Sequence, residues 1–155
     1  GAYFITVCTQ NRRNILSKII VGTGVLDCPK NKLLYHGEIA DRYIKQLNDF
    51  YDNVWVDKYV IMPDHVHILT TLPKTIALSE FVRIIKSNSS KWIKTKNVGY
   101  KQFEWQEGYG AFSVSPTLLD KTINYIRSQE EHHAKRNTKE EYKMFLDAYG
   151  IEYDE

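Results

Sequence analysis

Residues 54–71 read Val-Trp-Val-Asp-Lys-Tyr-Val-Ile-Met-Pro-Asp-His-Val-His-Ile-Leu-Thr-Thr. β-Branched and aromatic residues dominate both ends of this stretch, and such residues are typical of strands. Pro63 and Asp64 separate the two ends and are common turn residues. The stretch therefore predicts one strand over residues 54–62 and a second over residues 65–71.

Further strands and two helices are predicted around this pair. The additional strand candidates are residues 3–9, 32–36 and 110–115. Apolar residues recur at helical spacing between residues 38 and 51. One face of a second helix is marked by Phe81, Ile84, Ile85, Asn88 and Trp92. The order strand, helix, strand pair, helix, strand predicts an α+β fold, a ferredoxin-like sandwich with a central antiparallel sheet and helices on one face.

Extra helices are predicted at the C-terminal end of this sandwich. Pro116 can occupy the first position of a helix without losing a hydrogen bond, and Ser115 before it can act as the cap. This helix should include residues 125–129. Residues 138–141 form a capping-box pattern that opens a last helix, which Gly150 can close.

The composition is that of a soluble globular protein. A chain of 155 residues can bury a core and is short for two domains, so we expect residues 1–155 to form one domain. Hydrophobic residues make up 43% and charged residues 26%, which argues against a disordered chain. No apolar run approaches the roughly 18 residues that span a bilayer, so no membrane partner is expected. Because Gly1 already begins a strand-like segment, we expect that the natural start of the protein precedes it.

The cysteines give an indication of the cellular compartment. Cys8 and Cys28 show no metal-ligand spacing. We expect free thiols in a reducing cytoplasm, with a single disulfide as the alternative.

Charge is distributed unevenly along the chain. The formal net charge of +2 does not by itself indicate a nucleic-acid-binding protein, but residues 83–96 are basic and residues 152–155 are acidic. Basic and hydroxyl side chains can bind a phosphate backbone, and aromatic side chains can stack on unpaired bases. The candidate DNA-binding residues are Arg83, Lys86, Ser90, Lys91, Trp92 and Lys94, with Trp105 as a further stacking candidate. An ordinary solvated helix surface is the alternative interpretation.

His65 and His67 form the first candidate for chemistry. Side chains alternate along a strand, so these two imidazoles project from one face while Val66 projects from the other. Two imidazoles about 7 Å apart along one strand can converge on a single cation. Two buried, hydrogen-bonded histidines without a metal are the alternative, because a bare His-x-His pattern matches often by chance.

A third metal ligand is available from the helix after Pro116. Tyr125 and Gln129 are four residues apart, so they share one face of that helix. The carbonyl oxygen of Gln suits Mg²⁺ or Mn²⁺ alongside imidazole. A tyrosine phenol is a weak nucleophile near neutral pH, but a nearby dication favours the phenolate. Two His, one Gln and one Tyr thus form a candidate phosphoryl-transfer site, although most of the eleven tyrosines must be structural.

Three neighbouring residues have weaker indications. Asp64 can orient a metal-binding histidine or can simply be the turn residue after Pro63. His132 and His133 follow Gln129 by about one helical turn. They can contact phosphate, supply an alternative ligand, or be solvated near a helix end.

The chain resembles the HUH single-tyrosine transposases of bacterial insertion sequences, including the REP-associated tyrosine transposases. Four blocks carry the resemblance, in the family's order and over nearly the whole chain. They are Tyr3-Phe-Ile-Thr-Val-Cys-Thr-Gln-Asn-Arg12, Val60-Ile-Met-Pro-Asp-His-Val-His67, Trp105-Gln-Glu-Gly-Tyr-Gly-Ala-Phe-Ser-Val-Ser115 and Tyr125-Ile-Arg-Ser-Gln-Glu-Glu-His-His133. Each block alone is weak, whereas the four together are specific.

The resemblance implies roles for four residues. His65 and His67 match the metal-binding pair, Gln129 the third ligand and Tyr125 the attacking tyrosine. It also implies a reaction without ATP on single-stranded DNA that carries hairpins, through a 5′-phosphotyrosine that a different 3′-hydroxyl later resolves. A homodimer with active sites shared between subunits is implied by the insertion-sequence branch, and a monomer by the REP-associated branch.

Two other functions fit parts of this pattern. A domesticated relative could bind DNA hairpins without cutting, although all four candidate active-site residues are intact. A histidine-triad hydrolase needs a third alternating histidine, but Leu69 occupies that position. The sequence therefore favours an active single-strand transposase.

Overall fold

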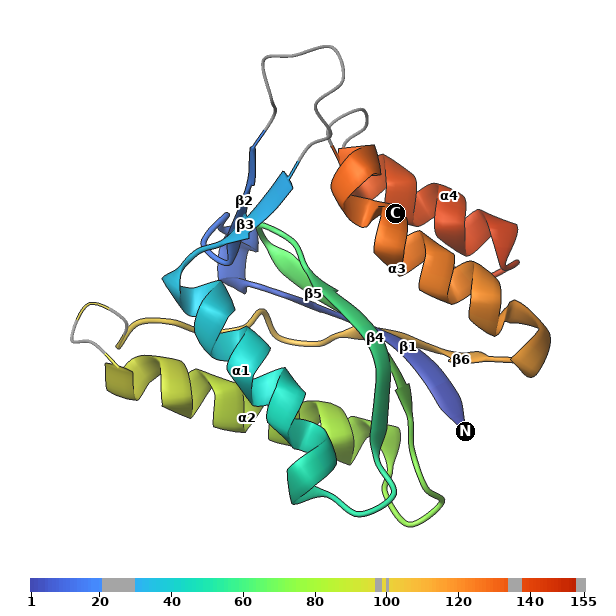
Figure 1. The fold of residues 1–155 in the computed structure, drawn as a ribbon, viewed down its shortest axis with the longest axis horizontal. Helices are drawn as coiled ribbons and strands as arrows, with labels where there is room; N and C mark the ends of the chain where they lie inside the picture. Colours follow the sequence, from blue (N-terminus) through green and yellow to red (C-terminus); the bar gives the residue numbers. More distant parts are fainter. Residues whose placement is uncertain (21–29, 97–98, 100, 134–137, 153–155) are drawn as a thin grey trace.

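The computed structural model of the chain describes residues 1–20, 30–96, 99, 101–133 and 138–152, with only the backbone for residues 130–133, 138, 139, 141, 142 and 145. Its main sheet has four antiparallel strands in the order β4 (Trp55–Ile61), β5 (His65–Thr71), β1 (Ala2–Cys8) and β6 (Gly110–Val114). Figure 1 shows this sheet running between the helix pair α1 (Tyr35–Phe50) and α2 (Leu78–Lys96) and the helix pair α3 (Leu119–His133) and α4 (Thr138–Ala148).

The prediction of a ferredoxin-like sandwich is confirmed. The two central strands, β5 and β1, are flanked by β4 and β6, so the first and third strands of the main sheet are neighbours. The crossovers from β1 to β4 and from β5 to β6 contain α1 and α2. The strand pair predicted over 54–62 and 65–71 is present as β4 and β5, with a β-bulge between Val56 and Lys58.

The two faces of the sheet bury different cores, as strand alternation requires. Ile5 and Ile68 belong to the core beneath α1 and α2. Phe4 and Leu69, their neighbours in sequence, belong to a second core beneath α3. The extra C-terminal helices therefore cover the face that a bare ferredoxin-like sandwich would leave open.

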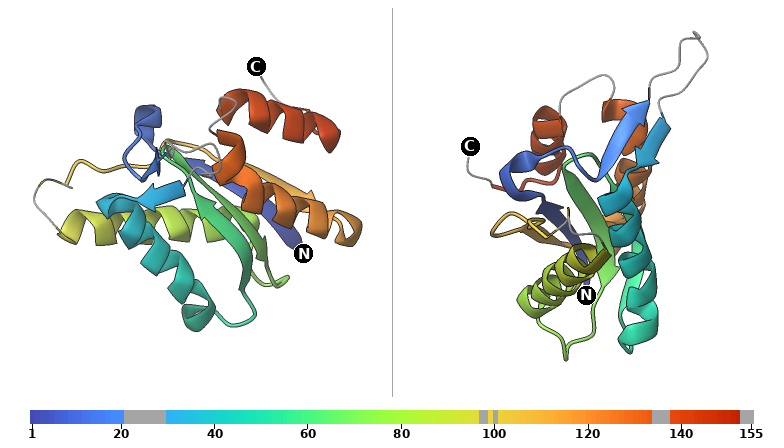
Figure 2. Two further views of the ribbon diagram at one scale, coloured as in Figure 1. Left: turned by 45° about the horizontal axis from the view of Figure 1, so that its top comes forward. Right: turned by 90° about the vertical axis from the view of Figure 1, so that its left-hand side faces the viewer.

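The start of α1 corrects the predicted strand over residues 32–36. The strand is β3 (Lys30–Leu33), which pairs with β2 (Ser17–Ile20), a strand that the sequence did not indicate. This two-stranded ribbon extends beyond the main sheet in Figures 1 and 2. Leu34 N donates to Leu16 O at 2.9 Å, and the helix begins at the next residue. The boundary is thus set by a contact with a distant segment.

The predicted helix faces are largely confirmed. Tyr43 and Leu47 of α1 are buried, and so are Phe81 and Ile85 of α2. Asn88, predicted on the apolar face of α2, is instead exposed.

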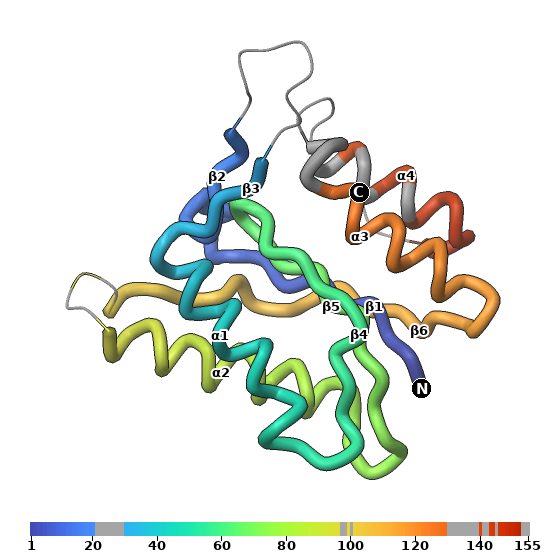
Figure 3. The backbone as a smooth tube through the Cα atoms, in the orientation of Figure 1, coloured from blue at the N-terminus to red at the C-terminus, as the bar shows by residue number. Residues whose placement is uncertain are grey.

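The chain turns sharply between β6 and α3. A 3-10 turn, η3 (Pro116–Leu118), follows Ser115, and Figure 3 shows α3 running back over the sheet from it. Ser115 is the cap residue by its backbone, but its hydroxyl lies 3.0 Å from Thr117 Oγ1 and makes no side-chain capping bond. The expected hydroxyl cap is therefore not formed.

The last helix packs on the outer side of α3. Tyr149 OH lies 2.9 Å from Thr122 Oγ1, and the Tyr149 ring lies 5.7 Å from the ring of Phe112 in β6. Gly150 follows α4 with a φ of +67°, as the prediction of a glycine stop requires. None of the helices in the described ranges has the length and apolarity to cross a membrane.

Candidate active site

His65 and His67 lie side by side on the sheet face that α3 covers. Their ring centroids are 4.5 Å apart, and each side chain is about 1% exposed. They are held by β5, a central strand that pairs with β1 and β4 along its length. The rigid placement expected from the sequence is therefore present.

The Nδ1 atom of each ring has a polar contact within the protein. His65 Nδ1 lies 2.7 Å from Asp64 Oδ1, and His67 Nδ1 lies 2.9 Å from Thr6 Oγ1 on the neighbouring strand. A carboxylate accepts, so this contact places the proton of neutral His65 on Nδ1 and the lone pair on Nε2. Nε2 is thus the nitrogen of His65 that can coordinate a metal.

The electrostatics of the site favour neutral imidazole. Burial is the main cause that lowers the pKa of His67 well below its ordinary value, and the charge of Arg12, with that of His65 whenever it is protonated, lowers it further. Burial raises the pKa of Asp64, but the hydrogen bonds with His65 and Arg12, together with the charge that Arg12 always carries and His65 carries when protonated, outweigh burial and bring it to about 2. A neutral His67 beside an ionised Asp64 suits a cation.

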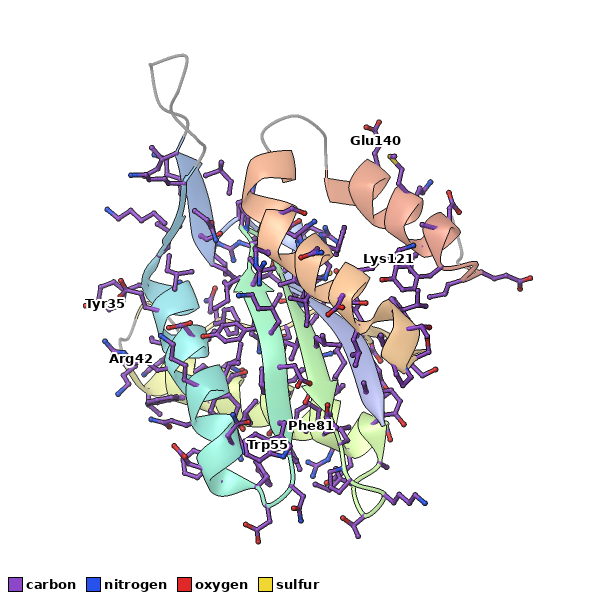
Figure 4. All side chains as sticks on the ribbon, turned by 45° about the vertical axis from the view of Figure 1, so that its right-hand side comes forward. Tyr35, Arg42, Trp55, Phe81, Lys121 and Glu140 are labelled. Carbon is purple, nitrogen blue, oxygen red and sulfur yellow. The ribbon has the colours of Figure 1, made fainter. Side chains whose placement is uncertain are left out.

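Helix α3 brings Tyr125 to the histidines of the same chain. The Tyr125 ring lies 5.8 Å from the His67 ring and 6.0 Å from the Phe4 ring, measured between centroids. Gln129, one turn further along α3, is about 1% exposed. Figure 4 shows how side chains fill the space between α3 and the sheet.

The residues fit a divalent metal by their chemistry. The carbonyl oxygen of Gln129 is a ligand that suits Mg²⁺ or Mn²⁺ alongside imidazole, and the amide nitrogen of the same side chain is buried without a hydrogen-bond partner among the described residues. Across the described ranges, no group of three or more His, Cys, Asp or Glu side chains is placed to hold a metal. The predicted ligand set differs from such a group because its third member is a glutamine.

The basic residues of α2 line a groove of about 610 Å³ on the other side of the sheet. We call it the α2 groove; it is lined by Arg83, Lys86, Ser90, Lys91 and Lys94 and, on its other wall, by Trp105 and Tyr109. Five of the six DNA-binding candidates predicted from the sequence therefore lie together in this groove. Trp92, the sixth, lines a different pocket and lies 6.3 Å from the Tyr43 ring of α1.

Two groove residues have partners within the protein. Lys86 Nζ donates to the carbonyls of Gln106 and Gly108, each at 2.7 Å, and so holds the opposite wall of the groove. Arg83 pairs with Glu80 on the helix surface. The DNA contacts predicted for both residues stay predictions, and Lys86 has a structural role in addition.

Comparison with known families shows to which family the chain belongs. Residues 2–129 match the sequence model of the family described as "Transposase IS200 like". The chain belongs to this family. A comparison with curated protein sequences gives no match.

Two solved structures share the fold of this IS200-like transposase. A REP-associated tyrosine transposase bound to a REP hairpin has a TM-score of 0.59 at 20% identity, covering 86% of this chain and 68% of that one. A protein from Deinococcus radiodurans R1 assigned as a transposase has a TM-score of 0.50 at 20% identity, covering 84% and 91%. The resemblance drawn from the four sequence blocks is therefore confirmed.

The remaining predicted residues of the transposase divide into two groups. Asp64 makes the contact with His65 that an orienting role requires. The side chains of His132 and His133 lie outside the described residues. One polar partner of the site, Arg12, was missed as a contact, and the only sequence signal for it was its position in the first family block.

Proposed function

We propose that this IS200-like transposase cleaves and rejoins single-stranded DNA at hairpin-flanked sites through a covalent 5′-phosphotyrosine on Tyr125. It acts as a single domain, in the cytoplasm, with a divalent metal and without ATP. The observation that carries the proposal is the contact of Tyr125 with His67, 5.8 Å between ring centroids, on the sheet of its own chain. This contact joins the candidate nucleophile to the candidate metal pair.

The proposed reaction exchanges one phosphate ester for another. The Tyr125 oxygen attacks phosphorus, the bond from phosphorus to the 3′-oxygen breaks, and the leaving 3′-oxygen takes up a proton. Attack by a different DNA 3′-hydroxyl then reverses the exchange and returns the phenol. Because the number of phosphodiester bonds is unchanged, no nucleotide hydrolysis is needed.

His65, His67 and Gln129 would hold Mg²⁺ or Mn²⁺. When bound, the cation polarises the phosphodiester and favours the phenolate form of tyrosine. The protein's own contribution is to keep both imidazoles buried and oriented through Asp64 and Thr6. Phe4, packed against both His67 and Tyr125, restricts the movement of the two rings.

The α2 groove is the proposed binding surface for the DNA backbone. Lys91 and Lys94 provide charge, Ser90 provides a hydroxyl, and Tyr109, 43% exposed, provides an aromatic surface. The structural relative that is bound to a REP hairpin supports hairpin DNA as the ligand. Trp105, on the groove wall, forms an isolated β-bridge with Thr9, which directly follows β1.

Two arrangements of the protein can use the same active-site residues: a site built within one chain and a site shared between two copies. Within one chain, α3 already lies across its own sheet and Tyr125 reaches His67. The homodimer with shared sites, which the sequence resemblance implies, requires α3 to exchange between copies through residues 115–118. We propose a homodimer as the assembly, and mixing two inactive variants tests which subunit supplies each tyrosine.

A denaturing gel for covalent protein–DNA adducts tests the function. Single-stranded oligonucleotides from the DNA flanking the gene are incubated with Mg²⁺ or Mn²⁺ and, separately, with EDTA. We expect an adduct that requires metal and is absent in Tyr125→Phe. Tyr109→Phe is the matched control, because it removes a phenol on the groove wall and should leave adduct chemistry intact at saturating DNA.

Two outcomes contradict the proposal. An adduct of wild-type yield in Tyr125→Phe would show that another residue attacks the DNA. Tight, metal-independent hairpin binding without any adduct would favour the alternative function, a domesticated hairpin-binding protein.

A further inference from the structure

The guanidinium of Arg12 connects the end of β1 to the histidine site. Arg12 Nε donates to Asp64 Oδ2 at 2.7 Å, and Asp64 Oδ1 lies 2.7 Å from His65 Nδ1. Each oxygen of one carboxylate thus has its own partner, and both partners are nitrogen donors. We propose that Arg12 is a positioning residue that fixes the plane of Asp64 and thereby the tautomer and orientation of His65. This inference rests on the proposed metal site.

The backbone around Arg12 is arranged for this contact. Asn11 and Arg12 have φ values of 57° and 55°, in the left-handed region that residues with a Cβ seldom adopt. Two consecutive residues in this region are unfavourable unless the surrounding contacts hold them there. These residues form η1 (Gln10–Arg12), whose role is thus to turn the chain back towards Asp64.

The same turn is tied to Asp64 through its backbone. Thr9 N donates to Asp64 O at 2.9 Å, and Thr9 Oγ1 lies 3.2 Å from the same carbonyl. Arg12 N donates to Thr9 O at 3.0 Å, which closes the turn. Main chain and side chain of residues 9–12 therefore hold Asp64 from both ends. A surface arginine without a role in the site would need neither this backbone turn nor the side-chain bond to Asp64.

Arg83 provides a contrast within the same molecule. It pairs with Glu80 three residues earlier on its own helix, and the two side chains are 64% and 49% exposed. Such an exposed pair contributes little. The Arg12–Asp64 pair instead joins residues 52 apart in the sequence, and its carboxylate is only 14% exposed beside a fully buried imidazole. Its geometry is therefore transmitted to His65.

Arginine suits this position better than lysine. Its guanidinium is planar and presents several donors at fixed angles, so it can bind Asp64 through Nε and contact Cys8 Sγ through Nη1 at 3.1 Å. A lysine ammonium would supply the charge but not the second fixed contact. The difference between the two residues separates a positioning effect from a charge effect.

The test measures the metal-free protein and Mn²⁺ binding, both without DNA. Long-range ¹⁵N–¹H NMR of the histidine rings reports which nitrogen of His65 carries the proton, and titration calorimetry gives the Mn²⁺ affinity. The variants are Arg12→Ala and Arg12→Lys. Arg13→Ala is the matched control, because it removes the same charge from the adjacent, exposed arginine.

We expect Arg12→Ala to bind Mn²⁺ about tenfold more weakly, as for other residues that orient a metal-binding histidine. Its His65 should show a mixture of tautomers where the wild type shows the Nδ1–H form. Arg12→Lys should restore the affinity only in part, and Arg13→Ala should match the wild type. Folding of each variant is checked by the thermal unfolding transition.

Three results would overturn the proposal. The first is an unchanged His65 tautomer in Arg12→Ala. The second is an unchanged Mn²⁺ affinity in Arg12→Ala, which would show that the metal site does not depend on the Arg12–Asp64 contact. The third is full recovery in Arg12→Lys, which would show that charge alone matters. If the wild type itself bound no Mn²⁺, the proposed metal site would fail, and the tautomer comparison would still decide the role of Arg12.

Discussion

At the scale of single residues, the site depends on which nitrogen of each histidine is held by the protein. Asp64 holds Nδ1 of His65, and Thr6 holds Nδ1 of His67 across the pair of central strands. Thr6 and His67 are directly opposite each other in the ladder between β1 and β5. A short hydroxyl on one strand is therefore enough to orient an imidazole on the next.

The substitution Thr6→Val keeps the shape of the side chain and removes the contact with His67. We expect Mn²⁺ affinity to fall about tenfold, because the imidazole loses the partner that fixes its orientation. The free energy of unfolding should fall by only about 1 kcal/mol, the usual contribution of one hydrogen bond. Calorimetric Mn²⁺ titration and urea unfolding provide the two measurements.

Thr70→Val is the control for this prediction. Thr70 is also buried on β5, and its hydroxyl donates to Trp55 O at 2.8 Å, but it projects from the face opposite the histidines. It should lose similar stability and keep wild-type Mn²⁺ affinity. Equal effects of both variants on Mn²⁺ would show that His67 orientation does not depend on Thr6.

At the scale of elements, the turn between β4 and β5, which contains Pro63 and Asp64, is supported by the start of α1. Leu16, fully buried, donates through its N–H to Pro63 O and accepts through its carbonyl from Leu34 N. Gly37 packs against that same carbonyl, and a Cβ on Gly37 would lie 1.9 Å from Leu16 O. The first turn of α1 can therefore approach the segment beside Pro63 only because residue 37 has no side chain.

Gly37→Ala should destabilise the fold by about 1–3 kcal/mol or more, the usual cost of overpacking a core. Helix propensity alone predicts the opposite sign, since Ala is favoured over Gly by about 1 kcal/mol in a helix. Urea unfolding decides between these effects. Glu38→Ala, at the neighbouring and less buried position, should change stability by less than about 0.5 kcal/mol. A stabilised Gly37→Ala variant would contradict the close approach.

A hydrogen bond between α1 and β4 predicts that the free energy of unfolding depends on pH. Tyr59 OH donates to Asp41 Oδ1 at 2.5 Å, and burial, followed by this hydrogen bond and the Asp41 charge, raises the pKa of Tyr59. Because the pKa is higher in the folded protein than the ordinary value of about 10, the contribution is complete below pH 10 and is lost as the pH rises above it.

We therefore expect Tyr59→Phe to be less stable than the wild type by about 1 kcal/mol at pH 8. The difference should shrink as the pH is raised beyond 10, in urea unfolding at matched ionic strength. Tyr109→Phe, on the exposed groove wall, should have the same free energy of unfolding as the wild type both at pH 8 and above pH 10. A gap between wild type and Tyr59→Phe that grows with pH would contradict the assignment.

Sequence reasoning succeeded at the element scale where the pattern is local. Residues 65–71 were predicted as a strand with the bounds that β5 has, because the β-branched run is uninterrupted and ends at a turn on one side. It failed at residues 32–36, because the end of β3 is set by pairing with β2 and by the contact of Leu34 with Leu16. Neither partner can be read from the local pattern.

At the scale of the whole molecule, the sheet separates two surfaces that the proposed function must combine. The α2 groove lies with the core beneath α1 and α2, whereas the histidines lie beneath α3. The sequence identified residues of both surfaces. It did not show that Lys86 closes the groove wall or that Arg12 reaches Asp64, because those contacts span 20 to 52 residues and depend on two turns.

The contact of Tyr125 with His67 in one chain predicts the result of a mixing experiment. His65→Ala and Tyr125→Phe chains are co-expressed and assayed together for DNA adducts. If each site uses its own α3, no adduct should form, because neither chain has both residues. Adduct formation in the mixture, but in neither variant alone, would show that α3 is exchanged between subunits.

The most direct test of the central claim is to locate the DNA on the protein by mass spectrometry. Trypsin should cut after Lys121 and Arg127 and release the peptide Thr122-Ile-Asn-Tyr-Ile-Arg127, which contains Tyr125 as its only tyrosine. After nuclease treatment of the metal-dependent adduct, we predict that this peptide carries a nucleotide linked through its 5′-phosphate, with fragmentation placing it on Tyr125. A nucleotide on any other tyrosine, or on no tyrosine, would contradict the account.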